Sequence, residues 1–167
     1  AYETPLRDKS MGRLYRVYPR GSENDVNPKL DPKNLDSLAA ALSHPNLFWR
    51  TQAQRLIIES ASPDAAAKLK ALIQKDPNGR AVVPAIYALK ILGAADDEIV
   101  KSALASTDRG IFRAGLATGS PEIIASTVIQ GGLIKAPDAR MLAETFVALS
   151  KAAPSDTVGK ALLATLK

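Results

Sequence analysis

Residues 43–58, SHPNLFWRTQAQRLII, contain the clearest structural signal in this sequence. Pro45 ends the preceding segment, and Asn46 is a favourable N-cap because its side chain can accept a hydrogen bond from a free first-turn N–H. At 3.6 residues per turn, one face of the following helix carries Trp49, Ala53, Leu56, Ile57 and Ser60. Phe48 and Ile58 lie off that face, so apolar surface is present on more than one side. We therefore expect a helix that lies between neighbouring helices.

The composition favours helices over a β-sandwich. Hydrophobic residues make up 46% of the 167 residues, but aromatic residues only 5%, and sheets concentrate aromatic and β-branched side chains. The net charge of +5 is compatible with nucleic acid, an anionic surface or an acidic partner protein, but no run of basic residues accompanies it. The absence of cysteine excludes disulfides, thiolate metal sites and cysteine nucleophiles. No stretch approaches the roughly 18 apolar residues of a membrane span.

The first 33 residues differ from the remainder. Residues 12–19, GRLYRVYP, alternate in the manner of a strand, and a run rich in Gly, Pro, Asn and Asp follows them. No second strand is evident, so we expect an extended arm that is unpaired within this chain. The predicted division is an extended arm or linker over 1–33, with the end of a preceding domain as the alternative, and a HEAT-like helical repeat domain over 34–167. The opening residues have neither a starting Met nor an apolar leader, which suggests a mature or excised piece.

From Asp31 onward, caps and turns recur at short intervals. They predict about nine short helices, over 31–43, from Asn46 to about 58, and over 62–74, 82–92, 96–105, 109–118, 120–130, 137–151 and 155–166. Short helices in alternating pairs suggest an internal repeat. A degenerate frame, Arg-x-x-Ala-x-x-Leu, supports this interpretation. Its positions, with the tryptophan that precedes the first copy, are Trp49, Arg50, Ala53, Leu56, Ala88, Ile91, Arg113, Arg140, Ala143 and Phe146.

The frame predicts a fold. The small alanines Ala53, Ala88 and Ala143 would let a paired helix approach closely, while Leu56, Ile91 and the Phe146 side chain would fill the layer between repeats. Each pair would leave an apolar flank that the next pair covers. The predicted fold is all-α, a right-handed HEAT-like α-solenoid of four to five helix pairs with an extended N-terminal arm.

Four stretches also resemble one region of a known family. They are GRLYRVYP (12–19), HPNLFWRTQAQRLI (44–57), AIYALKILG (85–93) and DARMLAETFVALS (138–150). They are similar to a region of the large bacterial proteins known as membrane-bound-dehydrogenase-like or haem-binding proteins. Such proteins consist of a sugar-dehydrogenase-like β-propeller, HEAT repeats and a c-type cytochrome module. The resemblance implies that 12–19 is the last propeller strand and that the remainder is the HEAT domain of an extracytoplasmic, periplasmic or cell-surface, redox protein.

The sequence also departs from that family. It has no CxxCH haem site, because it has no cysteine, so haem attachment cannot be transferred to it and we expect no cofactor. Where the family often has a histidine in the helix matching 85–92, this chain has Tyr87.

Other reactive side chains favour structural roles. His44, the single histidine, has no partner for a transition-metal site or a catalytic triad, and is expected to be a hydrogen-bonded surface residue. The acidic cluster 96–98 is expected to complement a helix dipole rather than bind calcium. Trp49 could stack on a base or ligand, but its position favours the core.

Three arginines and three aspartates invite two interpretations. Arg50, Arg113 and Arg140 could pair in a ladder with Asp76, Asp108 and Asp138 of adjacent repeats, or could line a basic strip for phosphates. Equal numbers of the two charges favour the ladder. The predicted function is a non-catalytic scaffold or protein-interaction domain, whose partners are other domains of the parent chain or an acidic protein. A nucleic-acid-binding HEAT module and an enzyme with a site on the concave face are the alternatives.

Overall fold

The computed structural model describes residues 28–130 and 138–165, and within these ranges every regular element is an α-helix. The all-α prediction is confirmed for this part of the chain. The helices are α1 Leu35–Ala41, α2 Leu47–Ser60, α3 Ala65–Lys75, α4 Val82–Ile91, α5 Asp97–Leu104, α6 Arg109–Thr118, α7 Pro121–Ile129, α8 Ala139–Ser150 and α9 Asp156–Thr165. Residues 12–19, the predicted strand, lie outside the described residues.

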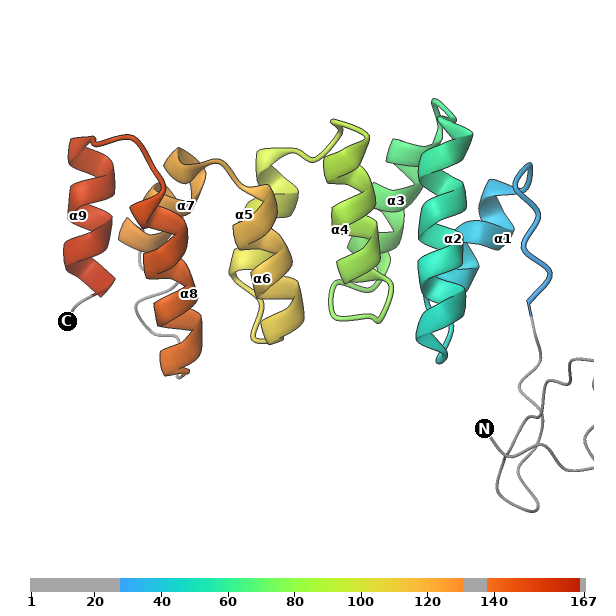
Figure 1. The fold of residues 1–167 in the computed structure, drawn as a ribbon, viewed down its shortest axis with the longest axis horizontal. Coiled ribbons are helices and arrows are strands. Elements are labelled where there is room, and N and C mark those ends of the chain that lie inside the picture. Colours follow the sequence, from blue (N-terminus) through green and yellow to red (C-terminus); the bar gives the residue numbers. More distant parts are fainter. Residues whose placement is uncertain (1–27, 131–137, 166–167) are drawn as a thin grey trace, which may run out of the picture.

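The helices form two rows that run along the longest axis of the molecule (Figure 1). We call α2, α4, α6 and α8 the even row, because each contacts the next in that order. The remaining helices are the odd row, in which α1 contacts α3, α5 contacts α7, and α7 contacts α9. Each odd-row helix from α1 to α7 contacts the even-row helix that follows it in the chain, as α1 contacts α2 and α5 contacts α6. The chain therefore advances along the array as it crosses between the rows.

Most helix boundaries follow from the local chemistry anticipated in the sequence. The Asn46 side chain accepts from the Phe48 N–H at 2.9 Å, and Ser120 caps α7 ahead of Pro121. Gly93 follows α4 with φ of 66°, a conformation that glycine adopts without a steric penalty. These caps confirm the predicted starts of α2 and α7 and the predicted end of α4.

Two helices begin later than predicted. The segment that starts at Asp31 forms a separate turn, with its carboxylate accepting from Lys33 N–H at 2.9 Å, and Asn34 then caps α1. Likewise Ser62, Pro63 and Asp64 form a turn before α3 begins at Ala65. In both cases an X-Pro step produces one turn ahead of the helix, because the residue before proline avoids the helical region.

The core is divided into two apolar clusters joined by α5 and α6. In α5, Ile99 and Ala103 belong to the first cluster, whereas Leu104 belongs to the second. In α6, Ile111 belongs to the first cluster and Phe112, fully buried, to the second. Adjacent residues on a helix point about 100° apart, so each of these helices buries two sides. Gly115 allows the close approach, since an added Cβ would lie 3.0 Å from the Ala103 Cβ.

The structure corrects several of the positions derived from the repeat frame. Ala53 and Ala88 are buried as expected, and Leu56 is partly buried. Ile91 is 64% exposed and Phe146 42% exposed, so neither is the buried filler that the frame predicted, and Ala143 is also exposed. In α8, the buried positions are instead Met141, Thr145 and Leu149. The frame placed its residues on the wrong side because α4 and α8 carry apolar side chains on both their inner and outer surfaces.

No helix in the described ranges combines the length and apolar character needed to cross a membrane.

Candidate interaction face

Arginine is confined to one side of the array. Every arginine in the described residues belongs to an even-row helix or, for Arg80, directly precedes the N-cap of α4. Within their bounds the even-row helices carry six basic and two acidic residues, a net charge of +4. The odd-row helices carry five of each, a net charge of zero. The basic character of the protein is thus concentrated on the even row.

Neighbouring helices of the even row are joined by polar side chains. Gln54 Nε2 of α2 donates to the Pro84 carbonyl of α4 at 3.1 Å. Lys90 of α4 donates to the Ala117 carbonyl of α6. Between α6 and α8, Glu144 accepts a hydrogen bond from Arg109 and forms an ion pair with Arg113. A polar link at each of the three junctions fixes the spacing of the helices and hence the shape of their outer face.

The predicted ladder, in which arginines pair with aspartates of adjacent repeats, is wrong. Arg109 Nη2 lies 3.0 Å and Arg113 Nε 3.4 Å from the same Glu144 carboxylate oxygen. Asp108 accepts from the Ile111 N–H of its own helix, and Asp138 from the Arg140 N–H. An aspartate that caps its own helix points into the first turn, so it is poorly placed to reach another repeat. Asp76 lies at the C-cap of α3, which again leaves the predicted pairing unmade.

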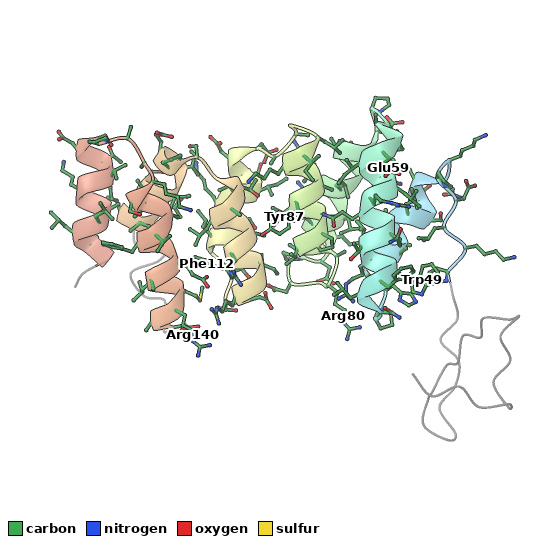
Figure 2. The ribbon with its side chains drawn as sticks, in the orientation of Figure 1. Trp49, Glu59, Arg80, Tyr87, Phe112 and Arg140 are labelled. Atoms are coloured by element: carbon green, nitrogen blue, oxygen red, sulfur yellow. The ribbon has the colours of Figure 1, made fainter. Side chains whose placement is uncertain are left out.

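Arg50 is held by backbone carbonyls. Its Nη1 donates to His44 O at 2.7 Å and to Pro45 O at 2.8 Å, which fixes the guanidinium at the start of α2. Arg80 and Arg140 make no ion pair within the described part of the chain. Figure 2 shows both at the lower edge of the array, with side chains directed away from the ribbon.

A groove runs between α2 and α4 on the even-row face. Its volume is about 340 Å³, and its walls include Leu47, Arg50, Gln54, Arg80, Val83 and Tyr87. The apolar walls remain in contact with solvent: Leu47 is 65% exposed. Two guanidinium groups and a phenol thus border a strip of aliphatic surface. Such a combination can bind an anionic group and an apolar side chain together.

A second groove, of about 400 Å³, lies between α6 and α8 on the same face. Val147, Ala143 and Leu116 supply its apolar surface, and Arg113 and Lys151 its positive charge. Its arginine already pairs with Glu144, whereas Arg80 in the first groove makes no ion pair with a described residue. The α2–α4 groove is therefore the stronger candidate for binding an anion.

His44 and Trp49 have structural contacts. His44 Nδ1 accepts from the Asn46 N–H at 3.0 Å, which agrees with its predicted role as a hydrogen-bonded residue. The Trp49 ring lies edge-on to the His44 ring at 6.5 Å and to the Phe48 ring at 5.0 Å. Trp49 is partly buried rather than fully buried, because it occupies the first turn of α2, near the edge of the array (Figure 2). The expectation of a core tryptophan is corrected to this extent.

The acidic cluster 96–98 caps α5. Asp96 accepts from the Ile99 N–H at 3.0 Å and from Lys70 Nζ at 2.7 Å. The hydrogen bond from Lys70, followed by that from Ile99, lowers the pKa of the Asp96 carboxyl below its usual value. In the described ranges, no group of three or more acidic or histidine side chains is arranged to hold a metal ion.

Sequence reasoning singled out Arg50, Arg113 and Arg140, which all lie on the even row. It missed Arg80 and Tyr87 as groove residues, and Glu144 as the shared acceptor. One signal was available: every arginine after residue 33 falls in, or just before, the second helix of a predicted pair.

Comparison with protein-family models, with curated proteins and with solved structures gives no match.

Proposed function

We propose that this chain is a non-catalytic protein-interaction scaffold built as a HEAT-like α-solenoid of four to five helix pairs. The two-row order of the helices supports the solenoid, because each even-row helix contacts the next even-row helix along the array. Helices α5 and α6, which each bury two sides, support it as well. An array of this kind displays one row of helices as a long, continuous binding surface.

The observation that carries the proposed role is the one-sided distribution of arginine. If both basic residue types served only solubility, we would expect them to be mixed on each row, but the odd-row helices contain lysine without arginine, and Lys90 of α4 is the one lysine within the even-row helices. Arginine binds carboxylates through two parallel hydrogen bonds and is enriched at protein interfaces. A face bearing arginine beside exposed aliphatic side chains suits a protein partner with acidic and apolar groups.

Nucleic acid is the second candidate, because the even row carries the net charge of +4. Non-specific phosphate binding needs an open series of basic groups along a backbone track. Here Glu144 holds Arg109 and Arg113, and Glu59 pairs with Arg55 at 3.6 Å. A phosphate backbone would also leave exposed aliphatic side chains such as Leu47 and Val147 in contact with water. These features favour a protein partner.

We further propose that the domain belongs to a larger extracytoplasmic redox protein. This part of the proposal rests on the four stretches similar to the dehydrogenase-like, haem-binding family. The sequence of the complete gene tests it. A flanking β-propeller sequence or a CxxCH module would support the assignment, whereas flanking domains of an unrelated class would overturn it.

Photo-crosslinking in the native host tests the scaffold role. A photoreactive residue placed at Thr51 or Ala143 reports on the even row, and one at Ala67 on the odd row; all three side chains are exposed. We expect discrete protein adducts, identifiable by mass spectrometry, from the even row and few from Ala67. Adducts with nucleic acid would favour the second candidate, and the absence of a discrete adduct from either row would contradict the scaffold.

A further inference from the structure

We propose that the α2–α4 groove binds a short extended segment of a partner protein in which acidic residues flank an aliphatic side chain. This inference rests on the proposed scaffold function and assigns it a site and a ligand class. The site consists of Arg50, Arg80, Leu47, Val83 and Tyr87, with Gln54 joining its two walls.

The groove has free hydrogen-bond donors directed at one ligand class. Arg50 uses only Nη1 for its carbonyl bonds, so within the described ranges Nη2 and Nε have no partner and can bind a carboxylate. Because the carbonyls of His44 and Pro45 already fix this side chain, binding costs it little conformational entropy. The guanidinium of Arg80 pairs with no other residue that the structure describes. Two arginines at one groove can neutralise two carboxylates.

The apolar part of the groove distinguishes a peptide from a simple anion. Leu47 and Val83 border the same groove as the two arginines, and an aliphatic side chain between the carboxylates would cover them. Exposed apolar surface rimmed by polar groups is typical of interaction sites. Inorganic phosphate could use the arginines but would leave this apolar surface exposed to water.

The size of the groove sets the length of the segment. Its α2 wall runs from Leu47 to Gln54, which corresponds to about 10 Å at a rise of 1.5 Å per residue. An extended chain covers about 3.3 Å per residue, so roughly three ligand residues fit. An acidic–aliphatic–acidic triplet has this length, and a strand with its edge toward the floor of the groove directs its alternating side chains to the two walls, each of which carries an arginine and an aliphatic side chain.

The protein's own N-terminal residues do not have this composition. Residues 1–27 contain five basic and four acidic residues, a net charge of +1, so their charge does not complement the groove. The inferred occupant is therefore a separate acidic segment.

Fluorescence anisotropy with defined probes tests the inference. The main probe is a labelled octapeptide with Glu-Leu-Glu at its centre and Gly and Ser elsewhere. Gln-Leu-Gln and Glu-Ser-Glu versions test the charges and the aliphatic side chain, and an eight-residue oligothymidylate tests nucleic acid. We expect saturable binding of the Glu-Leu-Glu peptide tighter than ~1 mM, and weaker binding of the other three probes.

Variants locate the site. Arg80→Glu should weaken peptide binding at least about tenfold, because a charge-assisted hydrogen bond is lost and a repulsion replaces it. Arg80→Lys should weaken binding by a smaller factor, because the charge remains but the planar fork is lost. Arg80 is exposed and makes no ion pair with another described residue, so we expect these variants to remain folded. The matched control, Lys101→Ala with Lys160→Ala, removes two exposed charges from the odd row and should leave binding unchanged.

Three outcomes would overturn the inference: no saturable binding of the Glu-Leu-Glu peptide, equal losses in the Arg80 and odd-row variants, or tighter binding of the oligothymidylate. The photo-crosslinks distinguish its failure from failure of the scaffold role. Even-row protein adducts without peptide binding would overturn the ligand class alone.

Discussion

Replacing Phe112 with alanine is the sharpest test of the packing described above. Phe112 of α6 is fully buried in the second apolar cluster, together with Val100 and Leu104 of α5. Its truncation leaves a cavity between these helices, and such changes cost about 3–5 kcal/mol of unfolding free energy. The matched change is Phe146→Ala in α8, where 42% of the side chain is exposed. That change should cost about 1 kcal/mol or less, because a half-exposed ring loses little burial and alanine is the better helix former.

Urea denaturation followed by far-UV circular dichroism measures both variants. We expect a large fall in the midpoint for Phe112→Ala and a small one for Phe146→Ala, with similar m-values. The comparison is informative because the repeat frame in the sequence predicted that Phe146 fills the layer between repeats. A larger loss from Phe146→Ala, or equal losses from the two, would refute the reasoning.

Other substitutions test single contacts. Gly115→Ala should destabilise the protein by about 0.5–2 kcal/mol, since crowding between α5 and α6 outweighs the gain in helix propensity. In the control Gly159→Ala, the added Cβ meets no atom within 4 Å, so this change should stabilise by about 0.5–1 kcal/mol. Equal effects of the two changes in urea denaturation would contradict the close approach of α5 and α6. Asp96→Asn keeps the cap but removes the charge. Because Lys70 lowers the pKa of Asp96, the charge stabilises the fold above the unfolded-state pKa of about 3.9 and this contribution is lost as pH falls through the lower folded-state pKa. The variant should thus be less stable than wild type by at most about 1 kcal/mol at pH 7, and this difference should shrink toward zero as pH falls through the folded-state pKa of Asp96. A difference that does not change with pH would contradict the pairing. Trp49→Ala should lower the free energy of unfolding less than Phe112→Ala in the same urea assay, since Trp49 is only partly buried. An equal loss would show that Trp49 contributes to stability as a core residue does.

Local chemistry in the sequence was enough to find the helices, because their ends depend on neighbouring residues. Asp108, Ser120 and Gly93 mark boundaries through side-chain caps or backbone freedom, and neither requires knowledge of the tertiary structure. The late starts of α1 and α3 show where this fails. A proline turn and a first helical turn carry similar residues, so the sequence does not separate them.

The sequence could not determine which side of α4 and α8 is buried. Both helices have apolar residues around most of their circumference, so 3.6-residue periodicity gives no unique inner face. Ile91 and Phe146 were therefore placed in the core although both are exposed. Contacts with neighbouring helices settle the matter, and these depend on residues about thirty positions away, as Gln54 and Pro84 illustrate.

The candidate face depends on the same long-range arrangement. Arg50 and Arg80 are thirty residues apart in the chain, and the groove exists only because α2 and α4 are neighbours in one row. In the sequence, the arginines after residue 33 already fall in or just before alternate predicted helices. Interpreting it required knowing that alternate helices lie side by side.

The most direct test of this account is a two-dimensional ¹H–¹⁵N NMR titration of the protein with the Glu-Leu-Glu octapeptide. The account predicts saturable chemical-shift changes concentrated at the starts of α2 and α4, over residues 47–54 and 80–87, with little change in α3 and α5. Changes centred on the odd-row lysines of α3, or spread evenly over both rows, would contradict the claim that the even row is the interaction face.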